Sequence, residues 1–187
     1  MRFTAPLMML ASLSGCAATI PPVEVTRFHL NQPIAPAPVE VDAGASLEAS
    51  AYGAAIKQAL ARIGFGEAPD GTPAAYLAKV SFDRTARAQA KQSPVSIGIG
   101  GGSFGGGLGI GVSTQLGLGG GVREIITSRM SVQLIRQGDG TIIWEGRAQT
   151  SAPATAPAAQ PGLAAEKLAS ALFRDFPGVS GQTITVP

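Results

Sequence analysis

Three segments of the chain alternate apolar and polar residues with a period of two. They cover residues 76–83, 126–134 and 142–149. This alternation is typical of strands that bury one face and expose the other to water. More than any other feature, it restricts the chain to folds built around a sheet.

The link between the last two segments fixes how they pair. A two-residue loop would place Leu134 opposite Ile143 and join opposite faces. A three-residue loop, Gly138-Asp139-Gly140, places Leu134 opposite Trp144 and puts Gly140 where a left-handed residue is needed. We therefore predict the three-residue loop. The last strand would then face the core with Ile142, Trp144, Gly146 and Ala148.

Two segments have helical periodicity. The first begins after Ser46, a suitable N-cap, and ends at Gly64, where a left-handed residue fits. Its apolar stripe consists of Leu47, Ala51, Tyr52, Ala55, Ile56, Ala59, Leu60 and Ile63. The second helix is predicted from Leu163 to Asp175, and the Ala/Pro-rich residues 151–162 before it are predicted to be a surface connector. Its inward residues would be Ala164, Leu168, Ala171, Leu172 and Phe176.

Shorter strands are predicted at residues 23–30, 39–41 and 183–186. In the first of these, the apolar positions change parity between Val25 and Phe28, which indicates either a bulge or a misplaced boundary. The predicted fold class is α+β. It is a two-layer sandwich with a mostly antiparallel sheet and two helices on one face.

A glycine-rich insert interrupts the pattern at about residues 95–122. It contains 13 glycines between Gly98 and Gly121, and its aliphatic residues recur at every second position. A hairpin-like excursion with one aliphatic face would show this pattern, either as a mobile surface loop or as a contact surface that includes Phe104, Leu108 and Ile110. Because every glycine disfavours a helix, a membrane-spanning helix is disfavoured. The glycine spacing lacks the helix and the acidic residue of a nucleotide site.

The amino terminus has the features of an export signal. Met1-Arg2 is positively charged, and residues 3–13 are mostly apolar but too short to span a bilayer. Leu13-Ser14-Gly15-Cys16 then matches the lipobox of bacterial lipoproteins, in which the cysteine is acylated and becomes the first residue. We expect a signal peptide at 1–15, a lipidated tether at 16–22, and one domain at 23–187. Ala17 after the cysteine favours the periplasmic face of the outer membrane.

Composition excludes several classes of function. A net charge of +2 and 5% aromatic residues give no nucleic-acid surface. One cysteine and one histidine, His29, leave no multi-cysteine or histidine-rich metal site. No serine has a nucleophile motif with a base, so we expect no catalytic residues, no cofactor and no enzyme. Trp144, on an alternating face, is predicted to anchor the core, or otherwise to stack on a ligand.

Several segments together resemble one family. They are the lipobox cysteine, the run Ser93–Gly107, the strand Ile143–Ala148 and the segment Leu172–Pro177. Their order is similar to that of the domain of unknown function 4136 family of Gram-negative lipoproteins. The resemblance implies a small α/β sandwich over nearly the whole mature chain, with no catalysis assigned.

From these features we expect a lipid-anchored structural or protein-interaction module of the cell envelope. Its partners would be the membrane, through the lipid at Cys16, and an envelope protein. The alternative is a binder of a small apolar ligand or lipid, held between the sheet face around Trp144 and the helices. The sequence leaves molecular activity and oligomeric state open.

Overall fold

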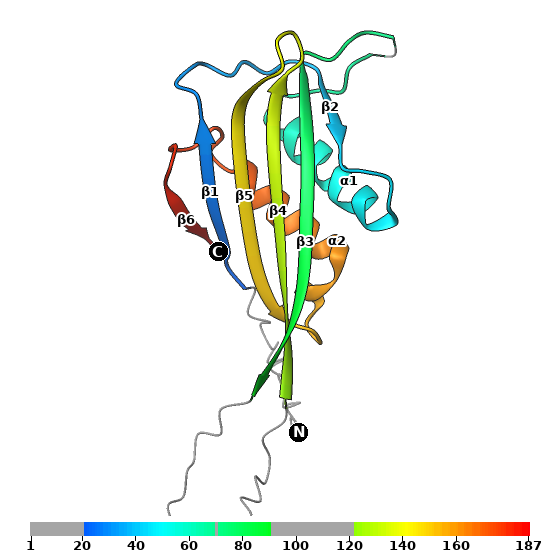
Figure 1. The fold of residues 1–187 in the computed structure, drawn as a ribbon, viewed down its shortest axis with the longest axis vertical. Helices are drawn as coiled ribbons and strands as arrows, with labels where there is room; N and C mark the ends of the chain where they lie inside the picture. Colours follow the sequence, from blue (N-terminus) through cyan, green and yellow to red (C-terminus); the bar gives the residue numbers. More distant parts are fainter. Residues whose placement is uncertain (1–20, 70, 91–121) are drawn as a thin grey trace, which may run out of the picture.

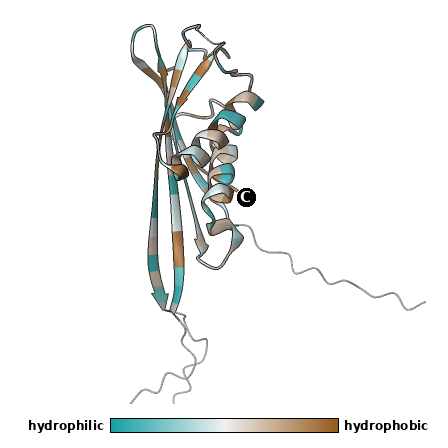
Figure 2. Ribbon diagram, turned by 90° about the vertical axis from the view of Figure 1, so that its right-hand side faces the viewer, coloured by the Kyte–Doolittle hydropathy of each residue, from teal (hydrophilic) through white to brown (hydrophobic). Residues whose placement is uncertain are grey.

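The computed structural model describes residues 21–69, 71–90 and 122–187. They form a two-layer α+β sandwich with one six-stranded sheet, in the order β2-β3-β4-β5-β1-β6. All strand pairs are antiparallel except β2 with β3, which α1 connects as parallel neighbours. Both helices cover the same face of the sheet and leave the other face open (Figures 1 and 2). The predicted fold class is confirmed.

The elements follow one another along the chain as β1 Val23–His29, β2 Val39–Asp42, α1 Leu47–Arg62, β3 Tyr76–Ala90, β4 Val122–Arg136, β5 Thr141–Pro153, the 3-10 helix η1 Pro157–Ala159, α2 Pro161–Phe173 and β6 Thr183–Val186. The hairpin of β3 and β4 is longer than the alternating segments indicated and extends beyond the helices (Figure 2).

Helix α1 has the predicted ends. The Ser46 hydroxyl accepts a hydrogen bond from the Ala49 amide at 3.0 Å. At the other end, the backbone of Gly64 is left-handed, with a φ of +93°. The amides of Gly64 and Phe65 donate to Ala61 and Leu60, which is the Schellman arrangement. The stripe was wrong at its first residue: Leu47 is 93% exposed, because it precedes the turn that packs on the sheet.

The link between β4 and β5 differs from the prediction by one residue. Leu134 does pair with Trp144, and Gly140 is left-handed as expected. The loop, however, holds four residues, 137–140, and an extra residue at Ile143 restores the register. This bulge turns both Ile143 and Trp144 inward. It leaves Ile142 45% exposed, so its predicted inward position was wrong.

Strand β1 contains no bulge, since its register with β5 is continuous from Glu24 to His29. The change of parity has a different cause. Phe28 faces outward and is 44% exposed, whereas Arg27 is buried at 4% exposure. A charged side chain therefore occupies the inward position that the hydrophobic pattern assigned to an apolar one.

Arg27 is buried because it caps helix α2. Its Nε and Nη2 groups donate to the carbonyls of Leu172 and Ala171, each at 2.9 Å. These carbonyls belong to the last turn of α2, where no helical partner exists and the helix dipole is negative. Burial lowers the pKa of the Arg27 guanidinium and the charge of Asp175 partly offsets this, but an arginine keeps its proton at any ordinary pH.

The core lies between the helices and the inner face of the sheet. Trp144 is 1% exposed, stacks on Phe173 with ring centroids 5.3 Å apart, and donates from Nε1 to the Pro177 carbonyl at 3.0 Å. Gly146 makes room for this ring: a Cβ there would lie 2.3 Å from Trp144 and 2.7 Å from Leu172. The predicted core position of Trp144 is what the structure shows.

The chain between β5 and α2 corrects two further boundaries. The predicted surface connector at 151–162 begins inside β5 and contains η1, with Ala152 and Ala159 both buried. Helix α2 ends at Phe173 rather than Asp175, because the backbone of Arg174 and Asp175 is no longer α-helical. Of the predicted inward residues of α2, four are buried and Phe176 is partly buried against the core.

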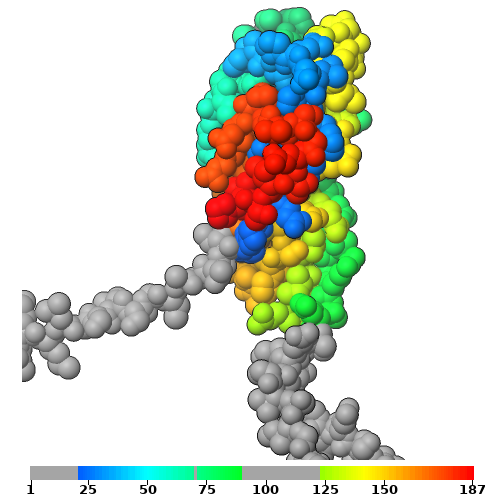
Figure 3. All heavy atoms as spheres, turned by 90° about the vertical axis from the view of Figure 1, so that its left-hand side faces the viewer, coloured from blue at the N-terminus to red at the C-terminus, as the bar shows by residue number. Residues whose placement is uncertain are grey.

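The segment after α2 leads to β6, which is the edge strand of the sheet beside β1. This segment passes over β1, and β6 then pairs with β1 from Thr183 to Val186 (Figure 3). Gly178 has a φ of +80°, and a Cβ there would lie 2.7 Å from the Arg27 side chain. Arg27 is thus enclosed by α2 on one side and by the chain that leaves it on the other.

We predict that Arg27→Leu lowers the free energy of unfolding by about 2 kcal/mol, since two buried helix-end carbonyls lose charged donors. Urea denaturation followed by circular dichroism measures this. Arg147→Leu is the matched control: that side chain is 66% exposed, and its loss should change stability by less than about 1 kcal/mol. Equal effects of the two variants would contradict the capping role.

Candidate functional site

The open face of the sheet is the candidate site, because it carries ordered side chains that no helix covers. Strands β3, β4, β5 and β1 contribute aligned positions to it, which form rows across the sheet. The rows nearer the start of β1 are polar. The row near the loop at 137–140 is aliphatic.

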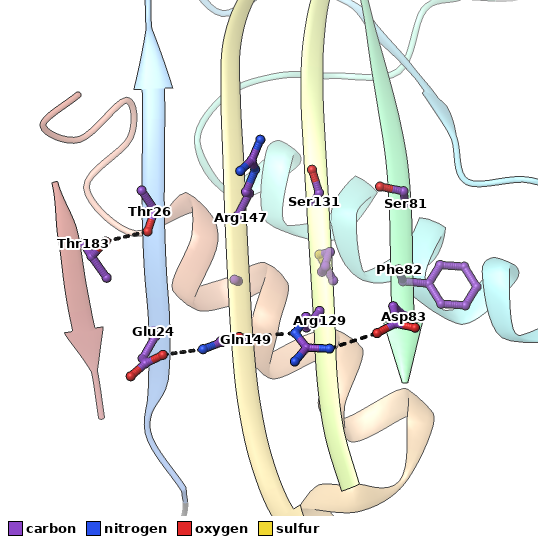
Figure 4. A pocket seen from close by; sticks show the side chains of 12 residues that line it. Glu24, Thr26, Ser81, Phe82, Asp83, Arg129, Ser131, Arg147, Gln149 and Thr183 are labelled. Atoms are coloured by element: carbon purple, nitrogen blue, oxygen red, sulfur yellow. Dashed lines mark hydrogen bonds and ion pairs between the residues drawn. The ribbon is translucent and has the colours of Figure 1, made fainter. Parts of the chain in front are cut away.

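One polar row is hydrogen-bonded across four strands (Figure 4). Gln149 donates to Glu24 and accepts from Arg129 Nε at 3.3 Å. Arg129 Nη1 in turn lies 3.1 Å from Asp83 Oδ2. Glu24 lies on β1 and Gln149 on β5. Arg129 lies on β4 and Asp83 on β3. Each one restrains its neighbour, so the row presents a fixed pattern of charge.

A shallow hollow of about 630 Å³ lies over this row. Its further lining includes the next row along the strands, where Thr26, Arg147, Ser131 and Ser81 align. The Thr26 hydroxyl bonds to Thr183 of β6 at 2.7 Å (Figure 4). The hollow thus has carboxylates at both sides, guanidinium groups between them, and hydroxyls on its floor.

Glu145 belongs to a second polar group on this face. Gln133 donates to its carboxylate at 3.2 Å, and Arg147 donates at 2.9 Å. The hydrogen bond from Gln133 lowers the pKa of the Glu145 carboxyl most, burial opposes this, and the bond and charge of Arg147 lower it further. Glu145 is therefore held as a carboxylate at neutral pH.

The aliphatic row lies at the opposite end of the face from the start of β1. Leu77, Ile135 and Ile142 align across β3, β4 and β5. Ile142 is 45% exposed. Phe28 of the neighbouring strand β1 and Leu30 just after this strand are 44% and 40% exposed. Apolar side chains grouped on a solvent-facing surface are typical of a contact site.

The sequence-predicted site residues have separate positions. Cys16, Phe104, Leu108 and Ile110 lie outside the described residues. Trp144 is in the core, and the side chains of Phe173, Phe176 and Leu172 pack around it. His29 lies beside the chain that follows α2, where its Nε2 is 3.1 Å from the Gly178 carbonyl. Of these residues, His29 and Trp144 belong to the described part of the chain, where they lie opposite each other on β1 and β5.

Within residues 21–69, 71–90 and 122–187, no group of three or more His, Cys, Asp or Glu residues could hold a metal ion. In the same part of the chain, no helix has the length and apolarity needed to cross a membrane. The polar rows hold carboxylates and guanidinium groups that are bonded to one another, without a nucleophile next to a base.

The family model described as domain of unknown function (DUF4136) matches residues 26–178, which is most of the chain. The chain belongs to this family. The DUF4136 domain therefore extends from the middle of β1 to the segment after α2, and it includes most of the open face and the capped end of α2.

Among curated proteins, the uncharacterized protein ZMO1243 of Zymomonas mobilis is 43% identical over 54 residues. That match covers 29% of this chain and 20% of the relative, so most of the relative's length has no counterpart in the matched part.

Several solved structures are similar to this chain at low sequence identity. The PelC dodecamer of Paraburkholderia phytofirmans has a TM-score of 0.44 at 12% identity, with 79% of this chain and 94% of that chain covered. A PDZ domain protein of Parabacteroides distasonis has a TM-score of 0.49 at 7% identity, with 88% and 39% covered. A putative lipoprotein of Caulobacter crescentus has 0.38 at 16%, with 73% and 82% covered. Scores at this level support no conclusion about what the DUF4136 domain does.

Sequence reasoning missed the open face as a site. The polar residues of each strand were visible, but their alignment into rows depends on register, which only strand pairing fixes. The aliphatic row had a partial signal, because Phe28 breaks the alternation of β1. From the sequence, that break is compatible with either a bulge or a misplaced strand boundary.

We predict that Gln133→Leu raises the pKa of Glu145 towards its ordinary value, because the hydrogen bond that lowers it most is lost. A ¹³C NMR titration of the Glu145 side chain measures this. Gln137→Leu, which removes a similar bond to Glu40, should leave Glu145 unchanged.

The lowered pKa of Glu145 determines how its contribution to the free energy of unfolding changes with pH. The carboxylate of Glu145 stabilises the fold above its unfolded-state pKa, and this contribution disappears as the pH falls through the lower folded-state pKa. A Glu145 titration that is identical in the wild type and in Gln133→Leu would contradict the role of Gln133.

Proposed function

We propose that this protein is a lipid-anchored protein-interaction module of the bacterial cell envelope, attached through Cys16 and binding an envelope protein with the open face of its sheet. The anchor would lie on the periplasmic side of the outer membrane. The protein would carry out no catalysis.

The aliphatic row on the open face is the observation that carries the proposal. A solvent-facing sheet surface normally presents polar side chains, and the two rows that line the hollow do so. One row instead forms a continuous apolar strip, made of Leu77, Ile135 and Ile142. This strip is not part of the core. Such a strip, beside polar rows of fixed charge, has the composition of a protein interface: an apolar centre and a polar surround.

The position of the strip fits an anchor at the amino terminus. Strand β1 begins at Val23, seven positions after Cys16 in the sequence. Because β1 is antiparallel to β5 and β5 to β4, Val23 lies towards the end of the sheet where β3 ends and β4 begins. A lipid on Cys16 would keep that end near the membrane. The aliphatic strip at the other end would then face away from the membrane, within reach of a partner.

The alternative, a small apolar ligand held beside Trp144, gains no support from the packing. The ring of Trp144 fills the space over Gly146 and stacks on Phe173. A ligand between this part of the sheet and α2 would have to displace the core itself.

The anchor is tested by labelling cells with radioactive palmitate. We predict that the wild-type protein is labelled and fractionates with the outer membrane, and that Cys16→Ser is unlabelled and stays unprocessed. Two or more acyl chains make attachment stable, so wild-type protein should remain bound after a high-salt wash. Label on Cys16→Ser, or an unlabelled wild-type protein, would overturn the anchor.

The interaction is tested with a photo-crosslinking amino acid at Ile142 of the full chain in cells. We predict a discrete crosslinked species with one envelope protein. The matched control is Leu47, an exposed leucine at the start of α1, which should give none. Only uncrosslinked protein at Ile142, or the same products from both positions, would overturn the interaction while leaving the anchor intact.

A further inference from the structure

Strand β3 has a long edge without a partner strand. Its neighbour β2 pairs only with residues Tyr76–Lys79, whereas β4 pairs with β3 along its whole length. From Val80 to Ala90 the other edge of β3 meets no strand in the described part of the chain. Figure 1 shows the middle of β3 at the outer side of the sheet, while the end of the strand crosses β4 in this view. Unpaired backbone groups on such an edge are a template for another strand.

The backbone groups that point to this edge can be assigned. The Tyr76 amide donates to Pro38 on the β2 side at 3.2 Å, and the Gln137 amide donates to Ala75 on the β4 side at 3.0 Å. Since the direction alternates along a strand, even-numbered residues of β3 direct their amides and carbonyls to the free edge. Odd-numbered residues place their side chains on the open face.

We infer that the free edge of β3 pairs with the same edge of a second copy of this chain, antiparallel and about a two-fold axis at Thr85. The two sheets would join into one continuous sheet. This inference concerns self-association and does not depend on the anchor or on the partner proposed above.

The length of the edge supports this register. Thr85 is the midpoint of Val80 to Ala90, so a two-fold axis there pairs the whole free edge of one copy with the whole free edge of the other. It also brings even-numbered residues opposite even-numbered ones, as hydrogen bonding between the edges requires. Strand β2 ends at Asp42, opposite Lys79, so it leaves the edge open from Val80 onward.

The charges support the same register. With the axis at Thr85, Asp83 of each copy lies opposite Arg87 of the other, which gives two ion pairs by symmetry. A shift by one allowed step places Asp83 opposite Gln89 or opposite Thr85 instead. Both Asp83 and Arg87 are exposed, and the contact of Asp83 with Arg129 at 3.1 Å leaves its second oxygen free to pair across the axis.

Self-complementarity distinguishes a second copy from an unrelated peptide as the occupant. An edge that serves a foreign strand has no reason to match its own reverse in charge. Thr85 would lie opposite itself as a close, non-hydrogen-bonded pair, and such threonine pairs stabilise antiparallel strands. The isologous contact is also the commonest way in which protein chains associate.

Cysteine crosslinking tests the register in membranes that carry the full chain. A pair opposite each other at the axis has Cα atoms about 4.5 Å apart, which a disulfide can bridge. We predict that Thr85→Cys forms a disulfide-linked dimer of the chain on treatment with copper phenanthroline. Thr127→Cys is the matched control, since Thr127 pairs with Thr85 across β3 and β4 but lies away from the edge. The wild type, with Cys16 alone, gives the background.

Sedimentation of the purified full chain in detergent tests the hydrogen-bonded edge. Ala86→Pro removes an edge amide without touching the bonds to β4, and should raise the dimer dissociation constant at least tenfold. Ala86→Ser keeps the amide and should match the wild type. Circular dichroism confirms that both variants fold.

Three results would overturn the inference: a monomeric wild type, equal crosslinking of Thr85→Cys and Thr127→Cys, or capture of a different protein at position 85.

Discussion

The capped end of α2 holds the two layers of this molecule together. Arg27 crosses from β1 to the carbonyls of Ala171 and Leu172, so one guanidinium joins the sheet to the helix that covers it. Nearby, the Trp144 indole donates to Pro177 in the segment that follows the helix. The direction in which the chain leaves α2, and thus the placement of β6 beside β1, depends on this cluster. A buried charge is tolerated here because the helix end supplies two acceptors and a negative dipole.

The division of the sheet into two faces determines what the protein can do. The inner face is covered by α1 and α2, and the Trp144 ring fills the space over Gly146. The outer face carries three kinds of surface: bonded polar rows, an aliphatic strip, and a free edge on β3. The strip and the free edge are the two surfaces that we propose for binding.

The two surfaces proposed for binding do not compete. The aliphatic strip lies at the end of the open face near the loop at 137–140, and the free edge lies along β3 towards the other end. Pairing of two copies through β3 would place their open faces side by side in one continuous sheet. A dimer would then present two strips to its partners, which raises the apparent affinity through multivalency without any new contact.

The sequence by itself determined the presence of the strands, the ends of α1 and the core position of the tryptophan. Alternation with period two and the caps at Ser46 and Gly64 are local effects, since they depend on backbone geometry and on burial of one face. The motif around Cys16 is local in the same sense. These features could therefore be predicted without knowing which elements meet.

Only the tertiary structure decided the features that depend on contacts between distant segments. Arg27 could not be predicted as buried, because its acceptors are more than 140 positions away along the chain. The four-residue loop and the bulge at Ile143 arise from two strands adjusting to a common core. The aliphatic strip and the free edge exist because register aligns residues across strands and because β2 stops early. The reason is physical: burial and hydrogen bonding are properties of the assembled sheet, and a linear pattern records only one strand's share of them.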